Sequence, residues 1–173
     1  MGACLMKEAD IVRDCIKAMI SESSSEVSVK CRIGVDEFES YNFFKEFISN
    51  VSDSGCNTFF VHARKAFLKG LDPKKNRTLP PLKYDYVYRL KREMPQLNII
   101  INGGIQTLEE CHNQLKLVDG VMVGRSIQAN PFFLEEVDHQ FYNQKMMSLE
   151  KNQVIAKYFC LLYTSPSPRD PIG

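Results

Sequence analysis

Leu97-Asn98-Ile99-Ile100-Ile101-Asn102-Gly103-Gly104 is the stretch of this 173-residue sequence that decides the fold. A short apolar run that ends at two glycines is typical of a strand buried on both faces of a parallel sheet. Residues 84–94 before it and 107–117 after it carry apolar side chains at helical spacing. The stretch is therefore predicted to be one strand of a repeating β-α unit.

The same alternation extends over the rest of the chain. Apolar periodicity predicts further helices over residues 9–20 and 41–51, and β-branched, alternating segments predict strands over residues 27–33, 58–63 and 120–125. An open doubly wound sheet and a (β/α)8 barrel both show this alternation, but no G-x-G-x-x-G fingerprint follows any strand. Only four strands are legible, so the sequence predicts an α/β fold that is the C-terminal half of an incomplete (β/α)8 barrel.

Composition and charge narrow the classes of protein that remain. The chain is 44% apolar and carries 22 Lys and Arg against 21 Asp and Glu, which excludes a disordered tail and a uniformly basic nucleic-acid wrapper. No apolar run is long enough to span a membrane, and the start lacks a signal peptide. We expect a cytoplasmic protein, with import into mitochondria or plastids depending on sequence ahead of Met1.

The six cysteines give no sign of a metal centre. They show no C-x-x-C pair and no nearby histidine at zinc spacing, so no metal site is predicted and the thiols are expected to be buried and reduced.

Unusual polar residues and glycines lie in the predicted strands toward their carboxyl ends or directly after them, where barrels place their active sites. They are Lys30, His62, Asn102-Gly103-Gly104 and Gly124-Arg125. Backbone N–H groups at the glycines, together with the charge of Arg125, would form a cradle for an anion such as phosphate. Ordinary turn chemistry is the alternative for the glycines. Lys30 either meets an anion inside the barrel or lies exposed on an edge strand.

A long basic loop follows the second predicted strand. About twenty residues with Gly70, Pro73, Pro80 and Pro81 separate it from the next helix, a length that favours a functional loop. Residues 64–92 carry ten Lys and Arg against two Asp, so the rest of the chain is acidic. This asymmetry suits contact with a phosphodiester backbone, and a solvated loop and helix surface is the alternative.

Six blocks of the sequence resemble the A subfamily of the tRNA-dihydrouridine synthases. They occur in order between about Gly2 and Leu134, and the H-A-R-K-A and D-G-V-M-V-G-R segments are the most specific. The blocks are Val27-Ser28-Val29-Lys30-Cys31-Arg32-Ile33-Gly34, Phe60-Val61-His62-Ala63-Arg64-Lys65-Ala66, Pro73-Lys74-Lys75-Asn76-Arg77, Pro80-Pro81-Leu82, Ile101-Asn102-Gly103-Gly104-Ile105 and Asp119-Gly120-Val121-Met122-Val123-Gly124-Arg125.

The resemblance implies a monomeric flavin enzyme with a (β/α)8 barrel and a small helical domain. Such an enzyme uses FMN and NADPH to reduce the C5=C6 bond of uridines in the tRNA D-loop, with a cysteine as general acid. It implies flavin contacts at Lys30 and His62, an FMN phosphate site at Asn102, Gly103, Gly104, Gly124 and Arg125, and tRNA contacts at Lys74 and Arg77. The target base must leave its stack, so the loop with Lys74 and Arg77 would hold the RNA backbone meanwhile.

The resemblance also sets the expected domains and their gaps. Residues 1–137 would be the partial flavin-binding barrel, residues 138–159 the start of the helical tRNA-binding domain, and residues 160–173 a proline-rich tail that is artefactual or disordered. The family's catalytic cysteine lies in a segment ahead of Met1, so no catalytic residue is assigned and the chain alone is expected to be inactive.

Two alternatives from other functional classes stay open. The chain could be a non-catalytic RNA-binding remnant that keeps the basic loop, or a flavin barrel oxidoreductase that acts on a small molecule. Loss of tRNA affinity on substitution of Lys74 and Arg77 would support RNA binding, whereas a flavin spectrum without tRNA affinity would favour the small-molecule enzyme.

Overall fold

The computed structural model describes residues 2–145 and 150–164 of the chain. These residues form four strands and a series of helices, which divide into two compact units, residues 1–129 and 130–173. The elements of the first unit are η1 (Gly2–Lys7), α1 (Ala9–Glu22), β1 (Ser28–Arg32), α2 (Tyr41–Ser52), β2 (Thr58–His62), η2 (Lys75–Arg77), α3 (Tyr84–Glu93), β3 (Asn98–Asn102), α4 (Leu108–Leu115), β4 (Gly120–Met122) and α5 (Arg125–Ala129).

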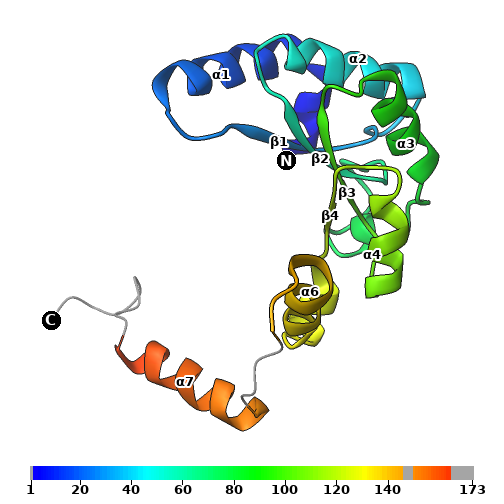
Figure 1. Ribbon diagram of the computed structural model, residues 1–173. Coiled ribbons are helices and arrows are strands. Elements are labelled where there is room, and N and C mark those ends of the chain that lie inside the picture. The colour runs from blue at the N-terminus through cyan, green and yellow to red at the C-terminus, as the bar shows by residue number, and fades with distance from the viewer. Residues whose placement is uncertain (1, 146–149, 165–173) are drawn as a thin grey trace, which may run out of the picture. The chain divides into compact units, whose positions relative to one another are not determined.

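The four strands form one parallel sheet in the order β1-β2-β3-β4. Figure 1 shows α1, α2, α3 and α4 along one side of this sheet. Right-handed crossovers between strands that follow one another in the chain place all their helices on the same face, whereas a doubly wound sheet reverses its strand order and covers both faces. The predicted α/β class is confirmed, and the consecutive order is that of part of a barrel.

The helix-facing side of the sheet holds the core of the first unit. Phe59, Val61, Ile99 and Ile101 occupy alternate positions of the two central strands, and all four are fully buried. Period-2 alternation places them on one face. The facing residues of the helices are fully buried as well and include Phe44, Ile48, Val51, Val87 and Leu90.

The register of the strands arranges the other face of the sheet into rows. The row nearest the carboxyl ends is Arg32, His62, Asn102 and Met122, and the row below it is Lys30, Phe60, Ile100 and Gly120. A hydrogen bond from Lys30 Nζ to Asn102 Oδ1 (3.3 Å) shows that the two rows share a face. Lys30, His62 and Asn102, the predicted site residues that lie on strands in the structure, are therefore on this face.

Local sequence signals set where the elements next to this edge begin. Thr107 and Glu110 form a capping box at the start of α4, with Thr107 Oγ1 accepting from the Glu110 N–H (3.1 Å). Asp119 precedes β4, and its carboxylate accepts from the Ile99 N–H (2.8 Å) and pairs with Lys91 (2.8 Å). These contacts fix the loops that lead into and out of β3.

Two sequence predictions for the first unit differ from the structure. The fourth strand ends at Met122 instead of residue 125, and Arg125 begins the five-residue helix α5. Burial of all six thiols is wrong, because Cys4, Cys15 and Cys160 are exposed and only Cys31, Cys56 and Cys111 are buried. The three exposed cysteines lie outside the strands and the helix-facing core.

The second unit contains α6 (Phe133–Tyr142) and α7 (Lys151–Thr164). The two units divide after residue 129, and the expected domain boundary at residue 137 stays a prediction. Helix α7 runs past residue 160, where a tail was predicted to begin, because residues 160–164 contain no proline and the first proline after them is Pro166. Residues 165–173 of that expected tail lie outside the described residues. No described helix has the length and apolar character that crossing a membrane requires.

Candidate functional site

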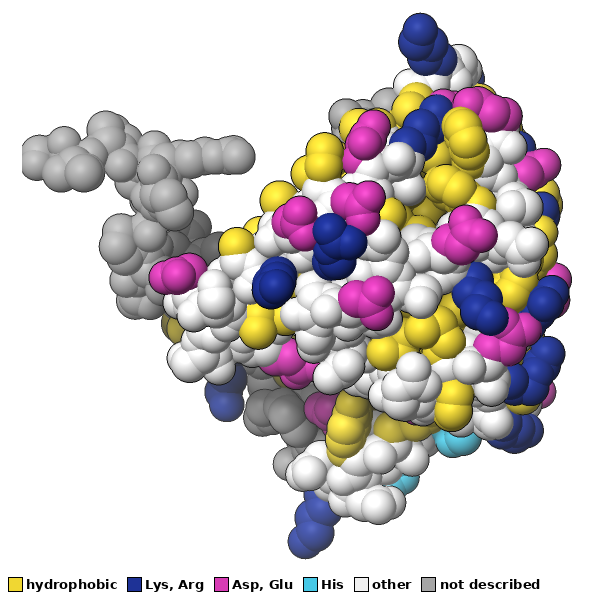
Figure 2. Space-filling model, turned by 90° about the horizontal axis from the view of Figure 1, so that it is seen from above, with side chains coloured by type: hydrophobic (Ala, Val, Ile, Leu, Met, Phe, Trp, Pro, Cys, Tyr) yellow, Lys and Arg dark blue, Asp and Glu magenta, His cyan; other side chains and the backbone are white. Residues whose placement is uncertain are grey.

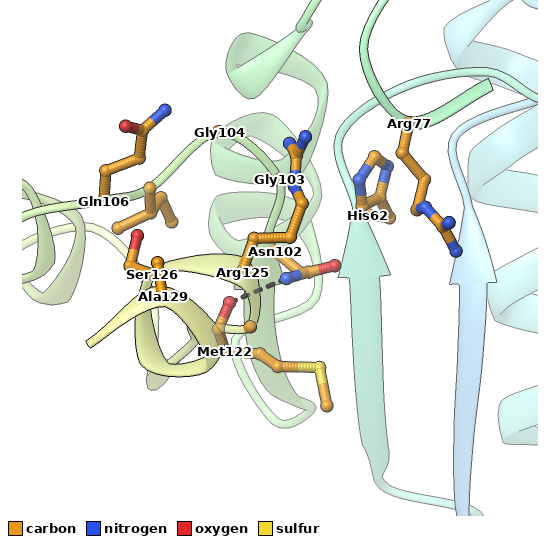
Figure 3. A pocket seen from close by; sticks show the side chains of 12 residues that line it. His62, Arg77, Asn102, Gly103, Gly104, Gln106, Met122, Arg125, Ser126 and Ala129 are labelled. Carbon is orange, nitrogen blue, oxygen red and sulfur yellow. Dashed lines mark hydrogen bonds between the residues drawn. The ribbon is translucent and has the colours of Figure 1, made fainter. Parts of the chain in front are cut away.

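Two neighbouring pockets open at the carboxyl ends of the strands, with volumes of about 380 Å³ and about 590 Å³. His62, Asn102 and Arg77 line both pockets. Figure 3 shows the first pocket, whose side chains come from the ends of β2 and β3, the basic loop, and the segment that follows β4. Segments far apart in the sequence thus meet at the edge where the sequence analysis predicted a site.

The Gly103-Gly104 turn forms one wall of the first pocket. Both residues have positive φ, +112° and +77°, a conformation that side chains other than glycine adopt at a cost. A Cβ at Gly104 would lie 2.7 Å from Leu82 Cδ1, and one at Gly103 would lie 3.2 Å from His62 Nε2. The hydroxyl of Tyr84 donates to the carbonyl of Gly103. Positive φ therefore favours glycine at both positions, and neighbouring side chains leave little space for a Cβ.

Gly124 serves a different purpose from the other two glycines. A Cβ at Gly124 would meet no described atom within 4 Å, and the residue lines the first pocket together with Arg125 and Ser126. The fold leaves room for a side chain at Gly124, so the absence of one keeps the pocket open beside the guanidinium of Arg125.

His62 is the most perturbed group of the site. The ring is buried, with 8% of the residue exposed, and its Nδ1 has no hydrogen-bond partner among the described residues. Burial, followed by the positive charges of Arg32 and Lys30, lowers the pKa of His62 to about 3. The imidazole is thus neutral at pH 7 and offers an unpaired ring nitrogen to a ligand.

Lys30 and Asn102 connect two strands across the open face. Lys30 Nζ donates to Asn102 Oδ1 (3.3 Å), while Asn102 Nδ2 donates to the carbonyl of Met122 (2.7 Å). The residue Lys30 is exposed, and partial burial of its ammonium lowers its pKa. The structure combines the two alternatives for Lys30, because the side chain lies on an edge strand and also lines the second pocket.

The electrostatic character of the site is cationic. Lys30, Arg32, Arg77 and Arg125 line the two pockets, and neither pocket is lined by an Asp or a Glu among the described residues. Clustered cations without counter-charges repel one another and attract an anion. The arrangement can therefore bind a phosphate or another polyanion.

The structure separates the two predicted RNA contacts. Arg77 reaches both pockets, whereas Lys74 lies exposed ahead of the short helix η2 and does not line either pocket. Sequence reasoning missed Arg32 and Asn76, which hold the loop to the sheet by a hydrogen bond from Arg32 Nη1 to the carbonyl of Asn76 (3.0 Å). Both residues lie in segments that resemble the synthase family, and that resemblance could have identified them. Hydrophobic periodicity did not distinguish them from their neighbours.

The basic stretch over residues 64–92 consists of the loop and α3, which differ in how their cations are paired with carboxylates. On α3, Arg89 pairs with Glu93 (2.7 Å) and Lys91 with Asp119 (2.8 Å). In the loop, Lys65 pairs with Glu39 (2.7 Å) and Lys75 with Asp72 (3.8 Å). Three further loop cations have no carboxylate partner within the part of the chain that is described, namely Lys69, Lys74 and Arg77. Figure 2 shows charges of both signs interspersed over the face that carries α1 and α2. Unpaired positive charge is therefore concentrated in the loop.

The chain is similar to one family of known proteins over nearly its whole length. The family described as dihydrouridine synthase (Dus) matches residues 1–165. A tRNA-dihydrouridine(20/20a) synthase of Pasteurella multocida is 48% identical over 158 residues, which cover 91% of this chain and 48% of that protein. Proteins of the same name from Yersinia pestis and Haemophilus ducreyi are 52% and 53% identical over 143 residues, covering 82% and 83% of this chain.

The chain spans less than half the length of these relatives, 48%, 41% and 44% in the same order. The match nevertheless includes every element that lines the two pockets, since it extends over nearly the whole chain. With the family model and relatives near 50% identity in agreement, this chain belongs to the dihydrouridine synthase family.

Proposed function

We propose that this chain supplies part of the flavin and RNA sites of a tRNA-dihydrouridine synthase, which reduces the C5=C6 bond of uridines in the D-loop. The names of its relatives specify positions 20 and 20a, and we assign the same positions to this protein. FMN is the cofactor of the proposal and NADPH its reductant, and the reaction takes place in the cytoplasm. The proposed partner is tRNA, and no metal takes part.

The residues present fit the two ends of FMN. The phosphate end would be bound by Arg125 and by the open backbone at Gly124, opposite the Gly103-Gly104 turn. This pocket is lined by no carboxylate among the described residues. The ring end finds the unpaired Nδ1 of buried His62. When bound, FMN supplies the hydride that reduces the uracil ring.

The chain's own residues have separate tasks in this proposal. Arg125 neutralises the flavin phosphate, and Lys30 offers a cation to electron-rich ring atoms while Asn102 orients it through their 3.3 Å hydrogen bond. His62 presents a neutral ring nitrogen, because burial keeps its pKa at about 3. Lys74 and Arg77 hold the RNA backbone, and their loop has unpaired positive charge for phosphates.

The single observation that carries the proposal is the row of polar residues at the sheet's carboxyl edge. His62 and Asn102 are aligned by strand register. They lie between the anion cradle at Gly124 and Arg125 and the basic loop. A cofactor site next to an RNA-contact loop is what reduction of a flipped base requires.

Disruption of the gene in its host tests the function without depending on where this sequence begins or ends. Mass spectrometry of tRNA fragments is expected to show loss of dihydrouridine at positions 20 and 20a, restored by the intact gene and not by the same gene carrying Arg125→Ala. Lys17→Ala, which removes a positive charge from the exposed side of α1, serves as the matched control and should restore the modification. Normal dihydrouridine after disruption would overturn the proposal.

A further inference from the structure

Asn76 is a buried residue in a part of the basic loop that is otherwise exposed. Only 6% of it is exposed, whereas the adjoining Lys75 and Arg77 are exposed. Its Nδ2 donates to the carbonyls of Phe67 (2.8 Å) and Leu71 (3.3 Å), and its Oδ1 accepts from the Phe67 N–H (2.8 Å). The side chain of Asn76 thus joins two parts of the loop by hydrogen bonds, as a pair of backbone N–H and C=O groups would.

Arg32, on the sheet, binds the backbone of Asn76. Strand register places Arg32 beside His62, and its Nη1 donates to the carbonyls of Asn76 (3.0 Å) and Lys65 (3.5 Å). The guanidinium is half-buried, so these two carbonyl contacts offset part of its desolvation. Asn76 is therefore held through its side chain by the loop and through its backbone by the sheet.

Arg77 depends on this fixation because its surroundings repel it. It follows Asn76 directly and lines both pockets. Arg32 and Arg77 line the second pocket together, and burial and the charges of Arg77 and Arg64 lower the pKa of Arg32. Without a bound anion, mutual repulsion drives Arg77 away from the pockets unless the backbone holds it there.

We propose that Asn76 is a positioning residue, which holds Arg77 at the pocket for contact with an RNA phosphate, and that Arg32 fixes Asn76 to the sheet. The inference rests on the proposed function and adds to it the residues that preorganise the RNA-contact loop. When the loop samples other conformations, the apparent affinity for RNA falls in proportion to the fraction that stays competent.

The test uses Asn76→Asp, which keeps the size of the side chain and the acceptor for the Phe67 N–H. It replaces the donor with a carboxylate oxygen that faces two carbonyls, so the loop should open. In filter-binding titrations, tRNA affinity of the 173-residue chain is expected to fall on the order of tenfold. Asn42→Asp, on the exposed surface of α2, adds the same charge and is expected to leave the affinity nearly unchanged.

A double-mutant cycle separates positioning from a general loss of structure. If Asn76 acts through Arg77, the pair Asn76→Asp and Arg77→Ala binds tRNA no more weakly than Arg77→Ala alone. Additive losses would overturn the inference, since they would mean that Asn76 acts by another route.

Hydrogen exchange gives a readout that does not require RNA. Amides of residues 64–80 should exchange faster in Asn76→Asp, while those of β2 and β3 keep their protection. Unchanged protection of the loop would refute the positioning role. If β2 and β3 lose protection as well, the same exchange measurement is made on Arg32→Gln, which removes the hydrogen bond from the sheet to the Asn76 carbonyl. An unmodified chain that does not bind tRNA would contradict the proposed function, and the exchange result would still decide the role of Asn76.

Discussion

The two faces of the sheet are built from the same strands and serve opposite purposes. On the helix-facing side, Phe59, Val61, Ile99 and Ile101 are fully buried among aliphatic and aromatic neighbours. One residue along each strand, the other side presents Lys30, Arg32 and a nitrogen of His62 that has no partner among the described residues. Because successive side chains of a strand point to opposite faces, one face can be selected for packing. The other face can then carry polar groups that remain available to bind a ligand.

The largest expected effect compares two adjacent phenylalanines. Phe59 is fully buried on the helix-facing side, whereas Phe60 is half-buried on the open face. Phe59→Ala should lower the free energy of unfolding by about 3–5 kcal/mol, because the cavity adds to the lost transfer energy, and Phe60→Ala should cost clearly less. Urea denaturation of both variants measures the difference. Equal losses would show that the two faces contribute alike to folding.

The second effect is a pH dependence that originates on the open face. The pKa of His62 lies at about 3 in the folded chain, below the ordinary value of about 6.5. Between these values the unfolded chain binds the proton and the folded chain does not, so stability falls as the pH decreases from about 6.5 toward 3. The expected loss is on the order of a few kcal/mol over this range.

Denaturation at a series of pH values, with His62→Gln for comparison, checks this assignment. The variant should lose that part of the acid sensitivity and keep the part due to carboxylates such as Glu93, whose pKa is lowered to about 2, first by hydrogen bonding to Lys45. An identical pH profile for the two proteins would remove His62 as its source.

The smallest effect compares two glycines at the pocket. Gly104→Ala places a methyl group 2.7 Å from Leu82 Cδ1 at a φ of +77°, and should cost about 1–3 kcal/mol of stability. Gly124→Ala has room for its methyl group and should leave stability nearly unchanged while weakening FMN binding, because the methyl group enters the pocket. Thermal unfolding and FMN titration together distinguish a glycine that the fold requires from one that the ligand requires.

Periodicity was sufficient to predict the strands, the helices and the edge of the sheet where the site lies. The polar residues Lys30, His62 and Asn102 could be found because each interrupts an apolar strand near its end. Asn76 and Arg32 could not be found this way. Their importance comes from hydrogen bonds across 44 residues of sequence, and a loop amide that becomes buried looks in the sequence like any solvated one. The extent of α7 to Thr164 was also missed, since the sequence from Cys160 onward does not continue the resemblance to the family.

Pairing of charges was the other property that the sequence did not reveal. Counting cations over residues 64–92 treated the loop and α3 as one basic surface. In the structure, Arg89 of α3 pairs with Glu93 of the same helix, and Lys91 pairs with Asp119, which precedes β4. Counter-charges from segments outside the counted range decide which cations stay free for RNA.

Titration of the chain with FMN and with riboflavin, which differs in lacking the phosphate, tests the central claim most directly. The account predicts that FMN binds about tenfold or more tightly than riboflavin, because Arg125 and the glycine turns receive the phosphate. It also predicts that Arg125→Ala abolishes this preference, whereas Lys17→Ala preserves it. Equal affinity for the two flavins in the unmodified chain would contradict the assignment of this edge of the sheet as a phosphate site.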